Sequence, residues 1–183
     1  MSTLYQRRVE QEWRLLELLA RANPNILENI KRDQEVDREV FGFTLHQTQA
    51  LIGKAEGFQF LNSHQAHLYF PKFFPSTPIE ASLVHPVFHP NVHRENGFVC
   101  LWNRFSSGDT VMEAVSQLQQ VITWKLVNQE RDHLMQPDAL AWYKDPARGM
   151  ELPLAHEPIC KPTNLQRERT YAIRPDSYRR RLE

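Results

Sequence analysis

A stretch punctuated by prolines and a glycine, residues 70–102, constrains the fold of this chain more than any other feature. Prolines follow one another closely at Pro71, Pro75 and Pro78. Proline has no backbone N–H to give, so these residues cannot lie in a central strand. Further on, Pro90 fixes the backbone before Asn91, and Gly97 permits a tight return toward Cys100. The prolines at 71–78 must therefore lie in an ordered, irregular connection, and a later loop that contains Gly97 ends at Cys100.

Cys100 and Asn91 are candidate reactive groups because of their residue types. A thiol reacts as its thiolate and must be accessible, and a polar donor must lie near the carbonyl oxygen on which charge develops. Asn91 can be that donor, or it can hold its own loop by bonding the backbone, as asparagine often does in turns. The second cysteine, Cys160, lies in a proline-rich segment without a motif, and we expect it to be a bystander.

The motifs in this stretch are similar to those of ubiquitin-conjugating enzymes. The sequence His-Pro-Asn at 89–91 and the sequence GFVCL at 97–101 resemble the family's HPN and GxxCL motifs. Upstream, FPKFFP at 70–75 resembles the family's FPxxYP, with Phe74 in place of tyrosine. HPN alone is a weak signal, but several motifs that keep their register over about thirty residues are a strong one.

The spacing of these motifs agrees with the family except in one loop. From Pro75 to His89 the step is 14 residues, as in the family. From Asn91 to Cys100 the step is 9 residues, one more than is usual. The loop between them carries an extra residue. The position of Asn91 relative to Cys100 therefore does not follow from the spacing alone.

The resemblance implies an α+β, UBC-like fold: an N-terminal helix, a four-stranded antiparallel meander, an active-site loop and C-terminal helices. The residue patterns predict the same order of elements. Apolar residues at helical spacing and a capping box at Thr3–Gln6 predict a first helix, which Asn23-Pro24 ends. Residues 25–34 show a mixed pattern. Strand-like runs then lie at 40–46, 49–54, 57–61, 67–70 and 79–84.

Two helices are predicted after the cysteine. A capping box at Thr110–Glu113 opens the first of them, and its apolar face runs from Val111 to Leu126. Pro137 opens a shorter second helix, since proline is favoured in a first turn.

We expect a conjugating domain over 1–150 and a basic, proline-containing tail over 151–183. From Lys161 onward the tail holds seven Lys and Arg residues and three acidic residues. Such a tail is either simply solvated or a docking segment for an acidic partner surface.

The resemblance implies the chemistry of Cys100. Its thiolate accepts the C-terminal carboxyl group of a ubiquitin-like protein from an activating enzyme, and an amine on a target protein then attacks the thioester. His89 and Asn91 belong to the same motif and join Cys100 in the expected catalytic group. This chemistry needs no cofactor.

Two positions are candidates for orienting the attacking amine, because a carboxylate or an imidazole can help it to lose its proton. Asp109 lies before the second helix, where it can instead simply face the helix dipole. His133 lies near the family's acidic or histidine position. The alignment there is loose by one residue, so Asp132 competes with His133, and a surface histidine without a role is the alternative.

Basic residues lie opposite the apolar face of the first predicted helix, at Arg7, Arg8 and Arg14. The resemblance implies that this face docks on the activating enzyme. A solvated face is the alternative. In either case, replacing Arg7 and Arg8 is expected to change stability by less than about 0.5 kcal/mol.

Composition and charge argue against several classes of protein. The formal net charge is zero, so there is no overall attraction to nucleic acid. No apolar run has the length of a membrane span, and the N-terminus has no apolar signal core. We therefore expect a cytoplasmic protein with no membrane partner, and a reducing compartment suits a reactive thiol. Two cysteines do not make a disulfide framework.

A metal site and a cysteine protease are competing hypotheses. His85, His89, His93 and Cys100 could supply the four nitrogen and sulfur ligands that zinc favours. The prolines among them prevent a shared helical face, and the spacing fits no standard zinc finger, so we expect no metal. The residues around Cys100 also match no recognised context of a protease nucleophile.

Two function classes remain: a transferase that carries a ubiquitin-like protein on Cys100, and a catalytically silent adaptor of the same fold. Silent relatives typically lose the cysteine or the HPN motif, whereas this chain keeps both. The longer loop, Trp102 after Cys-Leu and the missing Trp-Ser-Pro element depart from the eukaryotic pattern. The chain is similar to the standalone conjugating enzyme of bacterial ubiquitin-like conjugation operons that act in phage defence.

Overall fold

The computed structural model describes residues 3–53 and 57–162. Its helices are α1 (Leu4–Ala22), α2 (Val111–Ile122), the short 3-10 helix η1 (Arg131–His133) and α3 (Pro137–Lys144). Its strands are β1 (Leu27–Gln34), β2 (Glu39–Leu45), β3 (Ala50–Ile52), β4 (Gln59–Leu61), β5 (His64–Phe70), β6 (Glu80–Leu83) and β7 (Phe98–Val99). None of the helices described is long and apolar enough to cross a membrane.

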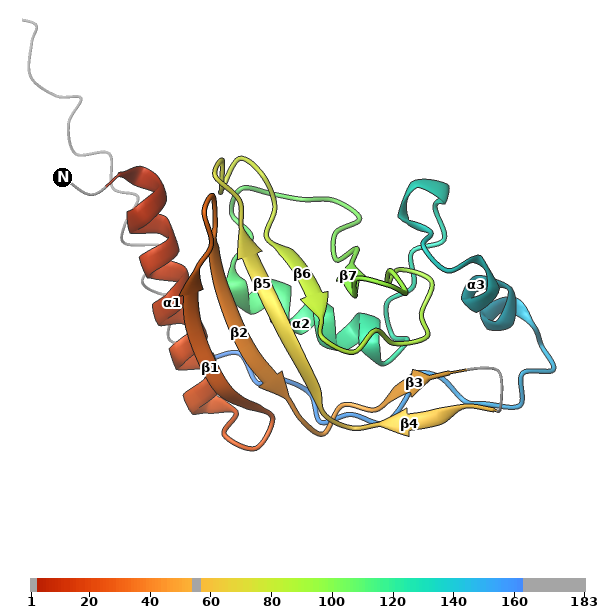
Figure 1. Cartoon of the computed structure of the whole chain (residues 1–183). Helices are drawn as coiled ribbons and strands as arrows, with labels where there is room; N and C mark the ends of the chain where they lie inside the picture. The colour runs from red at the N-terminus through yellow and green to blue at the C-terminus, as the bar shows by residue number, and fades with distance from the viewer. Residues whose placement is uncertain (1–2, 54–56, 163–183) are drawn as a thin grey trace, which may run out of the picture.

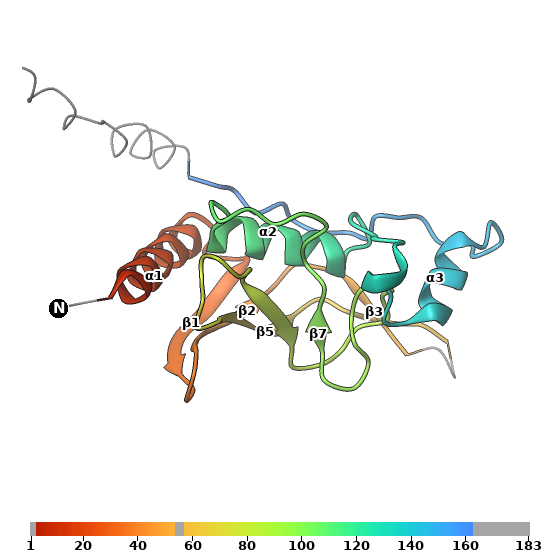
Figure 2. The same cartoon turned by 90° about the horizontal axis from the view of Figure 1, so that it is seen from above.

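The main sheet is antiparallel and has the spatial order β1-β2-β5-β6-β7. Strands β3 and β4 form a separate hairpin that extends beyond one end of this sheet (Figure 1). Helix α1 lies beside β1, α2 covers one face of the sheet, and α3 lies far from α1 at the other end (Figures 1 and 2). The short edge strand β7 leads directly into Cys100.

This arrangement confirms the predicted fold class and differs from the expected elements in three places. Strand β1 occupies a segment whose sequence showed only a mixed pattern. Only Leu27 of this strand is buried, so its sequence has no apolar alternation to predict a strand. The short β7 adds a fifth strand to the expected four. Helix α2 ends at Ile122, since Trp124 adopts a left-handed backbone conformation, and Leu126 lies beyond the helix.

The core fills the space between the helices and the sheet. Phe41 of β2 packs against Phe70 of β5, with 4.4 Å between the ring centroids, and Trp13 of α1 meets Phe41 edge-on at 5.0 Å. A second cluster forms around Trp124 and Trp142, whose rings lie 5.0 Å apart. The second cluster supports the loops that follow α2.

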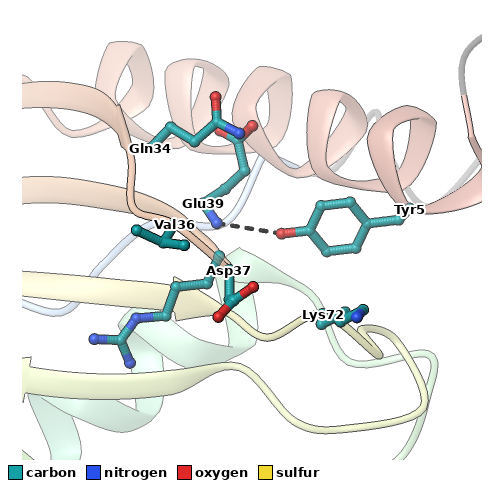
Figure 3. Close-up of a pocket in the computed structure, with 7 residues that line it drawn as sticks. Tyr5, Gln34, Val36, Asp37, Glu39 and Lys72 are labelled. Carbon is teal, nitrogen blue, oxygen red and sulfur yellow. Dashed lines mark hydrogen bonds between the residues drawn. The ribbon is translucent and has the colours of Figure 1, made fainter.

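A tyrosine near the start of α1 ties this helix to the sheet. The hydroxyl group of Tyr5 donates to the carbonyl oxygen of Phe70 (2.8 Å) and accepts the backbone N–H of Glu39 (3.2 Å; Figure 3). A cavity of about 230 Å³ opens beside it, and Val36 and Lys72 are part of its lining. Both predicted capping boxes are present as well, at the starts of α1 and α2.

A buried carboxylate joins α1 to the start of α2. Glu12 is fully buried, and its Oε2 accepts the backbone N–H of Val111 (2.7 Å). Arg8 forms an ion pair with Oε1 of the same carboxylate (2.9 Å), and its guanidinium group lies over the ring of Phe74. These contacts indicate a structural role for Arg8, in contrast to its expected place on a solvated or docking face. The effect of its replacement on stability stays a prediction.

The other two arginines of this face are exposed. Arg7 lies on the surface, and Arg14 keeps 71% of its side chain exposed while pairing with Glu10 (3.4 Å). Surface ion pairs of this kind contribute little to stability. Arg7 and Arg14 are thus free to meet a partner, and this role stays a prediction.

The first residues after position 150 pack against the domain. Leu154 donates its backbone N–H to the carbonyl oxygen of Thr123 (2.8 Å), and Cys160 donates its own to the side chain of Asn23 (2.7 Å). The predicted boundary at 150 stays a prediction, with this segment held on the domain. Most of the basic tail, residues 163–183, lies outside the described residues.

We expect Arg8→Ala to lower the free energy of unfolding by about 3 kcal/mol, because it leaves the buried carboxylate of Glu12 without its counter-charge. Denaturant unfolding measures this directly. Arg7→Ala is the matched control and should change stability by less than about 0.5 kcal/mol. Equal stability of the two variants would contradict the structural role of Arg8.

Candidate active site

Residues 91–100 form a small hairpin that fixes Cys100 relative to Asn91. The backbone N–H of Cys100 donates to the carbonyl oxygen of Asn91 (2.9 Å). Val92 and Val99 pair across the hairpin as antiparallel partners. Because the two ends of the hairpin are paired, the extra residue is absorbed in the turn and does not carry Asn91 away from Cys100.

The turn of this hairpin needs a glycine. Gly97 has a φ of 69°, and a Cβ atom there would lie 1.9 Å from the carbonyl oxygen of Leu83. The side chain of His93 closes the same turn, since its Nδ1 accepts the backbone N–H of Glu95 (3.3 Å). The approach of the turn to β6 is therefore fixed by sterics.

His89 supports the loop from the inside. Its ring is fully buried, accepts the backbone N–H of Asn91 at Nδ1 (3.1 Å) and packs edge-on against Trp124. Burial lowers the pKa of His89 to about 3, so the ring is neutral and carries its proton on Nε2. This geometry matches a ring that positions the loop, and the place of His89 in the expected catalytic group stays a prediction.

The side-chain amide of Asn91 joins this loop to the segment after α2. Asn91 is 1% exposed, and its Nδ2 donates to the carbonyl oxygens of Asn128 (2.8 Å) and His133 (2.9 Å). Its Oδ1 accepts the backbone N–H of Asn128 (2.8 Å). Both amide hydrogens are used, so of the two roles left open by the sequence the geometry matches the loop brace.

His133 meets the thiol of Cys100. The distance from Cys100 Sγ to His133 Nδ1 is 2.7 Å. On the other side of the ring, Nε2 lies 3.7 Å from a carboxylate oxygen of Glu130. Asp132 is exposed, so His133 is the residue of the competing pair that the structure brings to the cysteine.

The environment of Cys100 favours a protonated thiol at rest. The side chain is half-buried, and this burial raises the pKa of the thiol, while a hydrogen bond from the backbone of Trp102 acts in the opposite direction. The short contact between Cys100 Sγ and His133 Nδ1 matches a thiol that donates to the ring nitrogen. Such a pair needs the imidazole to take the proton when the sulfur attacks.

Asp109 lies in the turn before α2. Its carboxylate accepts the backbone N–H of Ser106 (2.8 Å), and its carbonyl oxygen accepts a long hydrogen bond from Arg8 (3.5 Å). These contacts match the reading of Asp109 as a helix-start residue, and its part in catalysis stays a prediction.

Sequence reasoning missed two buried residues that build the site. Asn128 holds Asn91 through its backbone and accepts the N–H of Glu130 at Oδ1 (2.8 Å). Gln136 donates through Nε2 to the carbonyl oxygens of Val87 (2.9 Å) and Val92 (2.8 Å). Neither residue belongs to a motif, because each acts on backbone groups that only the folded chain brings together.

The histidines considered as zinc ligands are used differently. His89 and His93 each accept a backbone N–H within the loop. Across residues 3–53 and 57–162, no group of three or more His, Cys, Asp or Glu side chains is placed to hold a metal ion. Cys100 stays the candidate reactive group of this loop.

We expect Asn91→Ala to lower the free energy of unfolding by about 1–3 kcal/mol, since buried carbonyl and N–H groups lose their partner. If Cys100 carries a ubiquitin-like protein as the resemblance implies, formation of the thioester (charging) and its transfer to an amine (discharge) should both slow. Both depend on the segment that carries His133, which loses its brace. Melting curves beside single-turnover kinetics test this. Slower discharge with unchanged melting and charging would instead identify Asn91 as an oxyanion donor.

Comparison with known proteins agrees with this fold. The family described as "Ubiquitin-conjugating enzyme" matches residues 14–146. A putative ubiquitin-conjugating enzyme from Trypanosoma cruzi aligns with a TM-score of 0.52 and 19% identity, over 81% of this chain and 96% of that one. Human ubiquitin-conjugating enzyme E2 G1 aligns with a TM-score of 0.44 and 20% identity, over 66% of this chain and 98% of that one. The family assignment does not depend on this alignment. No curated protein matches significantly.

The family match covers well over half of the chain, including the HPN loop and the cysteine. The helix order and the antiparallel sheet agree with it. The chain therefore belongs to the ubiquitin-conjugating enzyme family.

Proposed function

We propose that this protein accepts a ubiquitin-like protein from an activating enzyme as a thioester on Cys100 and passes it to an amine on a target protein. Thioester transfer is general in the family. The observation that carries the proposal for this chain is the 2.7 Å contact between the Cys100 sulfur and the imidazole of His133. A nucleophile with a proton acceptor at hydrogen-bond distance is the arrangement that thiol transfer needs.

In the charging step, the thiol of Cys100 attacks the carbonyl carbon of the thioester on the activating enzyme. His133 takes the thiol proton at Nδ1 as the new sulfur–carbon bond forms. The bond to the activating enzyme's sulfur then breaks, and the proton returns to that leaving thiolate. The Glu130 carboxylate, 3.7 Å from Nε2, stabilises the imidazolium ion that exists between these two events.

In the discharge step, the amine of the target attacks the same carbonyl carbon and must lose a proton. Nδ1 of His133 lies beside the sulfur and can take that proton. The bond from carbon to Cys100 Sγ then breaks, and the imidazolium ion returns a proton to the departing thiolate. The product is an amide, and the protein recovers its neutral thiol and imidazole pair.

A catalytically silent adaptor is the alternative function. Such a protein would need only the fold and its binding faces. The brace itself would stabilise either protein, but an imidazole placed 2.7 Å from the cysteine sulfur supports the enzyme over this alternative.

We further propose that the chain is the standalone conjugating enzyme of a bacterial conjugation operon that acts in phage defence. The longer hairpin turn, Trp102 and the missing Trp-Ser-Pro element support this placement. A reducing compartment such as the cytoplasm suits its reactive thiol. Exposed Arg7 and Arg14 are proposed to meet the activating enzyme.

Charging tests the proposal directly. Incubation with the activating enzyme, ATP and the ubiquitin-like protein from the same operon should give an adduct that thiols release. Cys100→Ala should abolish the adduct, because the attacking sulfur is gone. Cys160→Ala is the matched control and should still form the adduct. An adduct that forms equally well in Cys100→Ala would contradict the assignment.

A further inference from the structure

We propose that the thioester on Cys100 is also transferred to hydroxyl groups, so that serine and threonine side chains of a target are acceptors and the product is an oxyester. The observation behind this inference is the kind of side chain that the fold places at the sulfur. The inference rests on the proposed thioester chemistry and adds a second class of acceptor to the amine.

An amine and a hydroxyl group need different side chains in the site. A lysine side chain has an unperturbed pKa of about 10.4 and arrives as an ammonium ion, which a neighbouring carboxylate attracts. A hydroxyl group arrives uncharged and is a weak nucleophile. It becomes reactive when an adjacent base takes its proton during the attack, as in serine–histidine pairs. The side chain beside the sulfur therefore indicates which acceptor the site can activate.

The side chain beside the Cys100 sulfur is an imidazole. Nδ1 of His133 lies 2.7 Å from Sγ. Once the sulfur is acylated it carries no proton, so Nδ1 no longer accepts a hydrogen bond from it and is available to an incoming O–H group. The His133 side chain keeps 22% of its surface exposed, so a small hydroxyl group can reach the ring.

The carboxylates considered for this site are placed differently. Asp109 accepts the backbone N–H of Ser106 (2.8 Å) in the turn before α2. Glu130 lies 3.7 Å from Nε2 of His133, the ring nitrogen that does not contact the sulfur. There it can stabilise an imidazolium ion formed during transfer. The group that meets the sulfur is thus the base that a neutral hydroxyl group needs.

The transfer step balances without another reactant. The hydroxyl oxygen attacks the thioester carbonyl carbon, and its proton passes to Nδ1 of His133. The bond from carbon to Cys100 Sγ then breaks, and the imidazolium ion returns the proton to the departing thiolate. The products are an oxyester on the target and the original pair of thiol and imidazole. Because a serine side chain is short, we expect the acceptor to lie in an exposed, extended segment of the target.

A synthetic peptide thioester tests the inference without an activating enzyme. A short glycine-rich peptide, activated as the thioester of a small thiol, is loaded on Cys100 of the full chain carrying Cys160→Ala, which removes the exposed second thiol. Excess peptide is removed, and intact-mass measurement verifies the thioester. Three acceptor peptides are then compared, identical except for a central serine, lysine or alanine. Hydroxylamine distinguishes the products, since it cleaves an ester and leaves an amide intact.

The serine peptide should gain the acyl group in a product that hydroxylamine cleaves, and the alanine peptide should gain none. His133→Gln in the same background should slow transfer to serine on the order of a thousandfold, and transfer to lysine on the order of a hundredfold, because a hydroxyl group depends more on the base. His85→Gln, at an exposed histidine, is the matched control and should keep both parent rates. Melting curves verify that the variants fold.

The remaining outcomes separate this inference from the chemistry on which it rests. Transfer to lysine with no ester on serine would overturn the inference and leave the proposed function intact. Release of free peptide acid alone in the presence of the serine peptide would mean transfer to water, and would also overturn it. An ester that forms at the parent rate in folded His133→Gln would overturn the role of the imidazole and the inference with it. If no thioester forms on Cys100, the proposed function fails as well.

Discussion

The side-chain amide of Asn91 is the interaction on which the arrangement around Cys100 depends. It binds two carbonyl oxygens and one N–H of the segment 128–133, which ends at His133. The backbone carbonyl of the same residue holds the N–H of Cys100. One buried residue thus positions the nucleophile through its backbone and the imidazole through its side chain. The buried, neutral ring of His89 accepts the backbone N–H of Asn91 and so helps to hold this residue in place.

The position of Cys100 beside His133 determines how the thiol can react in the proposed mechanism. Burial raises the pKa of the Cys100 thiol, which favours the protonated thiol in the resting protein. In the proposed mechanism, the reactive state forms when the proton passes to the imidazole during attack. A nucleophile of this kind reacts poorly with small oxidants and alkylating agents, which require the thiolate. Its reaction depends on a partner that aligns a thioester carbonyl beside the sulfur.

The sequence predicted the fold because the motifs of residues 70–101 keep their spacing and both capping boxes form. It could not predict β1, where a single buried residue leaves no alternation to read. It placed Cys100 correctly in the loop but left Asn91 and His133 open, since both depend on the path of the chain after α2. It assigned Arg8 to a solvated or docking face, because helical spacing does not reveal that Glu12 is buried at the start of α2.

The central claim is that His133 acts as the base for transfer from Cys100. Single-turnover discharge of the preformed thioester onto lysine, compared between the parent and the His133→Gln variant, tests it. Without its base, the His133→Gln variant should discharge on the order of a hundredfold more slowly than the parent, while His85→Gln, at an exposed histidine, should match the parent. Equal discharge rates for the parent and folded His133→Gln would contradict the claim.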